Sequence, residues 1–116
     1  MQIQINAADM EASDSLWKFI EEEVRHELRH HAEQLTGVEV HLHDLNSPQK
    51  AGIDKRVLME ARLRGHQPIV AQDESSDIYE AVKGAAGKLN RALSNHLGRI
   101  SSRRTRDRSA EPFEGG

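Results

Sequence analysis

The sequence has no cysteine and very few aromatic residues: one Trp, one Tyr and two Phe among 116 residues. The absence of cysteine excludes a disulfide scaffold, catalysis by a thiol and metal sites built from thiolates. Hydrophobic residues make up 36% of the chain, so the core that they form must be mainly aliphatic and thin. A chain of this length is typical of a single domain.

Long apolar runs are also missing. No stretch approaches the roughly 20 apolar residues that are needed to span a bilayer. The first ten residues, MQIQINAADM, lack both the basic flank and the apolar run of a signal peptide. We therefore expect a soluble, cytoplasmic protein with no membrane partner.

Negative charge is in slight excess, with a formal net charge of −3, but the two ends of the chain differ. Residues 1–37 hold three basic and eight acidic side chains, and residues 38–82 hold five basic and eight acidic side chains. Residues 83–116 reverse this balance with eight basic and three acidic side chains. Such a split predicts a basic C-terminal surface, suited to nucleic acid, on a protein that is otherwise acidic.

Apolar periodicity predicts six elements in the order β-α-β-β-β-α. Strands are expected where apolar and polar residues alternate, and helices where apolar residues recur every three or four positions. The expected strands are 2–6, 38–43, 56–64 and 69–72, and the expected helices are 14–34 and 77–100. We expect Ser13 or Asp14 to cap the first helix, Thr36-Gly37 to end it, and residues 44–54 to form an exposed loop. The fold class is therefore α+β, with two amphipathic helices available to cover one sheet.

The expected last helix has an apolar stripe and a cationic side. The stripe consists of Ile78, Val82, Ala85, Leu89, Ala92, His96 and Ile100. Lys88, Arg91 and Arg99 fall away from it at about 100° of rotation per residue. This arrangement fits a domain that lays one face on a polyanion, and an ordinary solvated helix face is the alternative interpretation. Residues 101–116 have no apolar period, so we expect a domain of residues 1–100 followed by a disordered basic tail.

Signals for metal binding and catalysis are weak. Seven histidines are present, but a zinc site needs three or four converging ligands. His41 with His43, and His26 with His30, are pairs without an evident third ligand, so exposed polar histidines are the simpler interpretation. No nucleophile with an adjacent base is identifiable. We expect no enzyme activity, no cofactor, no metal ion and no small-molecule substrate.

The segment Gly84 to Lys88 (GAAGK) imitates a phosphate-binding loop without satisfying one. It lacks four residues between its glycines, a Ser or Thr after the Lys, and a preceding strand. Each glycine costs a helix about 1 kcal/mol relative to Ala. Gly84, Gly87 and Gly98 lie on the side of Arg91, away from the apolar stripe. A bare helix face there lets a phosphate backbone approach closely; helix–helix crowding and simple sequence drift are the alternative interpretations.

Two motifs of the last helix carry a family likeness. They are Asp77-Ile78-Tyr79-x-Ala81-Val82 and Lys88-Leu89-x-Arg91-x-Leu93-x-x-His96. They combine polar, aromatic and basic positions at fixed spacing. With the opening MQIQIN and the strand-helix-strand order, they make residues 1–100 resemble the bacterial ribosome hibernation-promoting factor and ribosome-associated inhibitor family, also known as sigma-54 modulation proteins. The chain resembles the short members, which have no additional C-terminal domain.

The resemblance implies a four-stranded sheet with both helices on one face, much like a double-stranded-RNA-binding domain. It also implies binding to the small ribosomal subunit between head and body, where the family overlaps the mRNA and tRNA sites of the decoding region and silences translation under stress. Lys88 and Arg91 match basic family positions, Tyr79 matches an aromatic one, and Arg99 extends the same face. The expected rRNA-binding residues are Lys88, Arg91, Arg99, Lys83, Tyr79, Arg103 and Arg104.

The first helix departs from the family pattern, which is typically rich in Lys there. Its outer side presents Glu21, Glu22, Glu23 and Glu27 against only Lys18, Arg25 and Arg29. The expected RNA contacts therefore fall on the last helix and the arginines after it. The sequence leaves open a second hypothesis, in which a divergent member of the same fold has left the ribosome and uses its acidic helix as a protein-interaction or stress module.

Overall fold

The computed structural model describes residues 1–49 and 52–109, with side chains for residues 1–45 and 52–98. Within these ranges the elements are β1 (Gln2–Ala7), α1 (Asp14–Glu27), a short 3₁₀ helix η1 (Arg29–Gln34), β2 (Leu35–Gln49), β3 (Ile53–Leu63), β4 (Ile69–Ser75) and α2 (Ile78–Ser109). The predicted α+β class and the predicted order of strands and helices are confirmed.

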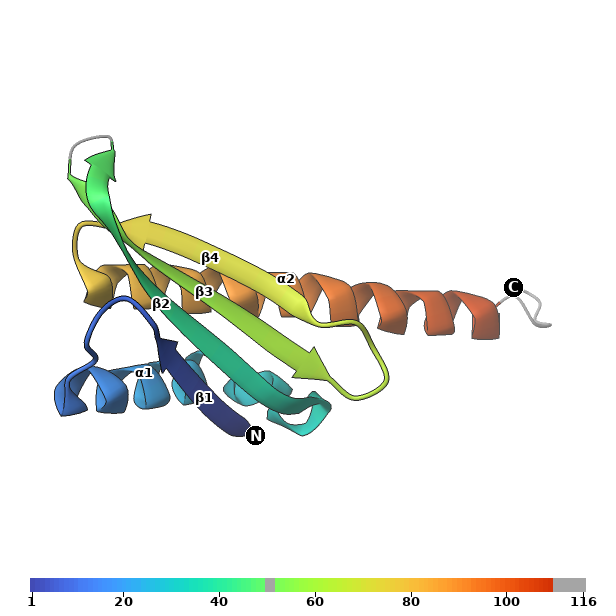
Figure 1. Ribbon diagram of the computed structural model, residues 1–116. Coiled ribbons are helices and arrows are strands. Elements are labelled where there is room, and N and C mark those ends of the chain that lie inside the picture. Colours follow the sequence, from blue (N-terminus) through green and yellow to red (C-terminus); the bar gives the residue numbers. More distant parts are fainter. Residues whose placement is uncertain (50–51, 110–116) are drawn as a thin grey trace.

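The strands form one open mixed sheet in the order β1-β2-β3-β4. β1 runs parallel to β2, because α1 returns the chain to the same end, and the other neighbours are antiparallel. Both helices lie on the same face of this sheet (Figure 1), as predicted, and the opposite face is open. Among the described residues, no helix is long and apolar enough to cross a membrane.

The core lies between the helices and the inner face of the sheet, and it is aliphatic as the composition predicted. Alternate residues of the central strands form its floor: Val38, Val40, Leu42, Val57, Met59, Ala61 and Leu63. The helices cover this floor with Leu16, Ile20, Val24, Ala81, Val82, Ala85, Ala86, Leu89 and Leu93. No polar or charged residue is fully buried within the described part of the chain. Hydrophobic burial is therefore the main force that holds helices and sheet together.

α1 starts as predicted and ends earlier than predicted. The Ser13 hydroxyl caps it by accepting a hydrogen bond from the backbone N–H of Leu16 at 3.1 Å. The helix ends at Glu27, and η1 carries the chain to Gln34. The expected continuation to Gln34 and end at Thr36-Gly37 are therefore wrong. η1 buries none of its residues, so no apolar contact holds this segment in α-helical form, and Leu35 already belongs to β2.

The segment 44–54, expected to be a loop, mostly continues the central strands as a hairpin. β2 extends to Gln49 and β3 starts at Ile53, with Asp44 opposite Lys55. The Lys55 ammonium donates to the Asp54 carboxylate at 3.0 Å and lies 3.8 Å from that of Asp44. The hydrogen bond to Asp54 raises the pKa of Lys55. Backbone pairing thus continues beyond the core in spite of the turn-forming composition.

α2 begins with a cap from Asp77, whose carboxylate accepts a hydrogen bond from the backbone N–H of Tyr79 at 2.9 Å. Of the predicted stripe, Val82, Ala85 and Leu89 are fully buried, and Ile78 and Ala92 are partly buried. Ala81, Ala86 and Leu93 are fully buried as well, which the prediction missed. The side chain of Ile100 lies outside the described residues. His96 is partly buried, with its ring edge-on to that of His66 at a centroid distance of 5.4 Å.

The helix continues to Ser109, so the predicted end of the last helix at residue 100 is too early. Extending an existing helix fixes only one residue per hydrogen bond, and Arg is a good helix former. The C-terminal part of α2 projects beyond the sheet (Figure 1). Residues 110–116 of the expected tail lie outside the described residues.

The buried position of Val40 gives a test of the fold. Val40 is fully buried in β2, so Val40→Asp should destabilise the protein by more than about 3 kcal/mol, because it places an unpaired carboxylate among apolar side chains. Val70 is 52% exposed on β4, so Val70→Asp should cost about 1 kcal/mol or less. Chemical denaturation of both variants, followed by circular dichroism, measures the difference. Equal stabilities would contradict the placement of β2.

Candidate nucleic-acid interface

The predicted cations of α2 occupy exposed positions wherever the structure describes their side chains. Lys83, Lys88 and Arg91 are all exposed. At about 100° per residue, Lys88, Arg91 and Arg99 fall within roughly 80° of one another around the axis. We refer to these three residues as the α2 arc. By the same count Arg103 adjoins the arc, whereas Arg104 lies on the other side of the helix, as part of the projecting C-terminal segment.

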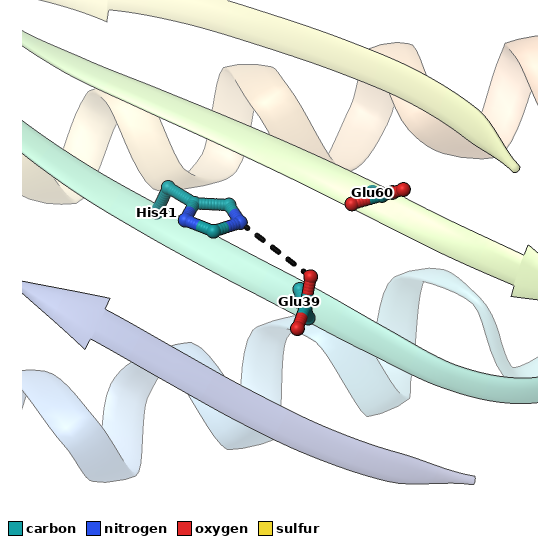
Figure 2. A group of neighbouring side chains, drawn as sticks. All are labelled: Glu39, His41 and Glu60. Atoms are coloured by element: carbon teal, nitrogen blue, oxygen red, sulfur yellow. Dashed lines mark ion pairs between the residues drawn. The ribbon is translucent and has the colours of Figure 1, made fainter.

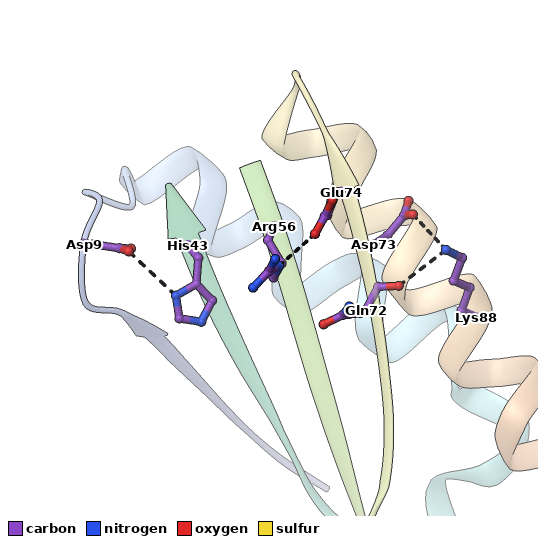
Figure 3. Close-up of polar contacts among 7 residues, drawn as sticks. All are labelled: Asp9, His43, Arg56, Gln72, Asp73, Glu74 and Lys88. Atoms are coloured by element: carbon purple, nitrogen blue, oxygen red, sulfur yellow. Dashed lines mark hydrogen bonds and ion pairs between the residues drawn. The ribbon is translucent and has the colours of Figure 1, made fainter. Parts of the chain in front are cut away.

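Lys88 is held by the neighbouring strand. Its ammonium donates to the Asp73 carboxylate of β4 at 2.9 Å and to the Gln72 backbone carbonyl at 3.4 Å (Figure 3). The Lys88 side chain is 50% exposed and that of Asp73 is 27% exposed. An ion pair this exposed contributes about 0–1 kcal/mol. Asp73 therefore orients the Lys88 side chain. The Lys88 ammonium remains accessible to an external anion that takes the place of the Asp73 carboxylate.

Asp73 also explains the glycine at position 84. A Cβ atom built on Gly84 would overlap the Asp73 carboxyl group. The absence of a side chain at Gly84 therefore makes room for a side chain of strand β4, and not for another helix as the crowding interpretation had it. The bare surface at Gly84 is occupied by a carboxylate and does not receive a phosphate in this arrangement. At Gly98 a Cβ would meet nothing within 4 Å.

Arg91 and Lys83 have weaker internal contacts. The Lys83 ammonium lies 3.5 Å from the Glu80 carboxylate, one turn earlier on α2, with both side chains more than half exposed. Arg91 is exposed and has no hydrogen-bond or ion-pair partner among the described residues. A Cβ on Gly87 would lie 3.8 Å from the Arg91 guanidinium, so the arginine lies along the glycine surface. Of Lys88 and Arg91, the two arc residues with described side chains, Arg91 is thus the more readily available to an anion.

Tyr79 links the two helices. Its ring packs edge-on against Phe19 of α1, with centroids 4.9 Å apart and planes at 70°. The residue is 37% exposed, so part of the ring remains accessible next to the start of α2. An edge-on pair of this kind contributes about 0.5–1.5 kcal/mol beyond its burial. The position that matches the family aromatic therefore has a packing role that the sequence did not reveal.

The basic residues of α1 lie in a different environment. The Arg25 guanidinium is 3.8 Å from the Glu21 carboxylate and donates to the Met1 carbonyl at 3.4 Å. Arg29 donates to the carbonyl of His26 at 2.6 Å. Lys18 is exposed and shares its helix with five glutamate and aspartate side chains. α1 therefore presents an acidic surface to an approaching polyanion, in contrast to α2.

Comparison with known proteins identifies relatives of this fold. Residues 3–101 match the family model described as sigma 54 modulation protein / S30EA ribosomal protein. A ribosomal subunit interface protein from Coxiella burnetii superposes with a TM-score of 0.70 and 24% identity, covering 84% of this chain and 99% of that chain. The N-terminal domain of Protein Y from Thermus thermophilus superposes with a TM-score of 0.64 and 21% identity, and the match covers 83% of this chain and 99% of that chain. A comparison with curated protein sequences gives no match. Because the family match extends over most of its length, this chain belongs to the sigma 54 modulation protein / S30EA ribosomal protein family.

Proposed function

We propose that this protein is a ribosome-associated hibernation factor that binds the small subunit near the decoding region and inhibits translation by occupying that space. Family membership supports association with the ribosome. The observation that carries the finer proposal is the α2 arc, a cationic surface on a chain whose formal net charge is −3. Such a factor acts in the cytoplasm and has no need of catalysis or of a cofactor.

The α2 arc supplies affinity by replacing the counterions of rRNA phosphates. Arg91 is free to contact a phosphate directly, and its planar guanidinium suits two-point contact with phosphate oxygens. Lys88 contributes by exchanging the Asp73 carboxylate for a phosphate. Shape fit of the whole domain to its binding channel supplies specificity, because proteins recognise folded RNA largely through its form.

A second candidate function rests on α1. Trp17 is 43% exposed, and it lines a shallow depression together with three acidic residues and one basic residue: Asp14, Glu21, Glu22 and Lys18. An exposed indole with nearby carboxylates favours a basic protein partner, through cation–π contact and ion pairs. Under this hypothesis the protein keeps the family fold but binds a protein rather than rRNA.

Two triple-alanine variants, one in the α2 arc and one in the basic residues of α1, test the proposal when their subunit binding is compared. The triple variant Lys88→Ala, Arg91→Ala, Arg99→Ala should bind the small subunit less tightly. The slope of log K against log salt should be lower by two to three, because each phosphate contact contributes about 0.7–0.9. The matched control, Lys18→Ala, Arg25→Ala, Arg29→Ala, should change the slope by less than about one. Co-sedimentation with purified small subunits across a salt series measures both.

Two outcomes would contradict this assignment. A loss from the α1 variant that equals or exceeds the loss from the α2 variant would place the interface on α1. An unmodified protein that fails to co-sediment with small subunits at moderate salt would favour the protein-partner hypothesis.

Deletion of residues 101–116 tests whether the projecting segment contributes to stability or to subunit binding. The melting temperature should stay nearly unchanged, because the core consists of residues up to Leu93. Subunit affinity should fall, since the deletion removes Arg103, Arg104, Arg106 and Arg108 and their long-range attraction to phosphates. Calorimetry and co-sedimentation of the shortened protein measure the two effects. A large drop in melting temperature would show that this segment packs on the domain.

Neutralising the internal partner of Lys88 should strengthen binding. Asp73→Asn keeps the size of the side chain next to Gly84 but removes the charge that competes for Lys88. Subunit affinity should rise by up to about fivefold, the equivalent of one exposed ion pair. Glu74→Gln is the matched control: it removes the same charge from the next residue, where Glu74 pairs with Arg56 at 2.9 Å, and it should change affinity by less than about twofold. Equal gains from both variants would indicate an effect of net charge alone.

A further inference from the structure

The open face of the sheet carries a group of metal-ligating side chains that the proposed function does not use. Glu39 and His41 project from β2 and Glu60 projects from β3 (Figure 2). Their ligand atoms, one imidazole nitrogen and two carboxylate oxygens, all lie within 4.8 Å of one another. In the part of the chain that the structure describes, no other three such side chains come this close.

The backbone of the two central strands fixes this group. Glu39 and Glu60 are direct cross-strand partners, so their Cβ atoms are roughly 5 Å apart. His41 is two residues further along β2 and therefore points to the same face. The His41 Nε2 atom lies 3.7 Å from Glu39 Oε1. Ligands held by paired strands are placed more reproducibly than ligands on loops.

The charges in this group favour a cation. Two carboxylates directly opposite each other on neighbouring strands repel. Arg62 offsets this repulsion: its guanidinium donates to Glu39 Oε1 at 2.8 Å and lies 3.7 Å from Glu60 Oε1. The position between the two glutamates already attracts a positive group.

Arg62 is a replaceable occupant. Its side chain is 50% exposed, whereas those of Glu39 and Glu60 are 24% and 25% exposed. The arginine therefore has room to turn into solvent while the carboxylates stay in place. Exposed ion pairs of this kind are weak, so a doubly charged ion with three ligands competes with it effectively.

We propose that Glu39, His41 and Glu60 form a binding site for a divalent transition-metal ion, with Zn²⁺ the best match. One imidazole and two carboxylates suit such an ion, whereas Mg²⁺ and Ca²⁺ prefer oxygen ligands alone. Zinc bonds of roughly 2.0–2.2 Å place neighbouring ligand atoms about 3–4 Å apart. Small side-chain rotations on an unchanged backbone close the site. Three protein ligands leave a coordination position for water or for a group of a binding partner.

Titration calorimetry with ZnCl₂ on the chelator-treated full chain tests this site without any ribosome. The unmodified protein should bind one Zn²⁺ with a Kd on the order of 10 µM. His41→Ala should weaken binding by at least about tenfold, because it removes a ligand. Arg62→Gln should tighten binding by about two- to fivefold, because it removes the competing cation.

His43→Ala is the matched control. His43 lies on the same face of β2, but its ring pairs with Asp9 at 3.8 Å (Figure 3), and it should leave the Kd within about twofold of the original value. Equal losses from His41→Ala and His43→Ala would overturn the proposal, because the metal would then be binding to scattered surface histidines. So would the absence of binding up to about 1 mM Zn²⁺ in both the unmodified protein and Arg62→Gln. Circular dichroism of each variant shows that the fold is intact.

Discussion

The pairing of β2 with β3 is the constraint on which the rest of the structure depends. Its register places three buried pairs beneath the helices: Val38 with Ala61, Val40 with Met59, and Leu42 with Val57. Because strand side chains alternate between faces, the pairs in between must point to the open side: Glu39 with Glu60, His41 with Leu58, and His43 with Arg56. A slip of one residue would exchange these two sets. The contacts that build the core therefore also place the charged groups of the open face.

The elements with clear periodicity were predictable from the sequence, and the errors fall where tertiary contacts decide the outcome. β3 was predicted from strict alternation, and α2 from a repeat of three and four. The hairpin beyond Asp44 was not predicted from the sequence, because Asn, Ser, Pro and Gly favour a loop locally. Backbone pairing with the opposite strand favours an extended chain instead. The early end of α1 depends on which side chains find the core, and the residues after Leu28 find none until Leu35.

The exposure of Lys83, Lys88 and Arg91 on α2 was predictable, because helical periodicity alone determines which residues share a side. The partner of Lys88 was not predictable, since Asp73 is 15 residues away on another element and the contact depends on how α2 crosses β4. The local signal was Gly84, an unfavourable residue in a helix interior, but it could not identify its neighbour. In the sequence, the evident partner of His41 is its strand neighbour His43. Glu60, the ligand across the ladder, becomes evident only from the register.

Under the proposed function, the contact between Lys88 and Asp73 influences which kind of anion α2 prefers. Asp73 is part of the same chain, so its effective concentration at Lys88 does not fall on dilution. A single free phosphate has to compete with this permanent neighbour for one ammonium group. A polymer of linked phosphates contacts Arg91 at the same time, and its second contact is effectively intramolecular. In the proposed interface, the internal carboxylate therefore favours polymeric anions over small ones, without any change in the shape of the protein.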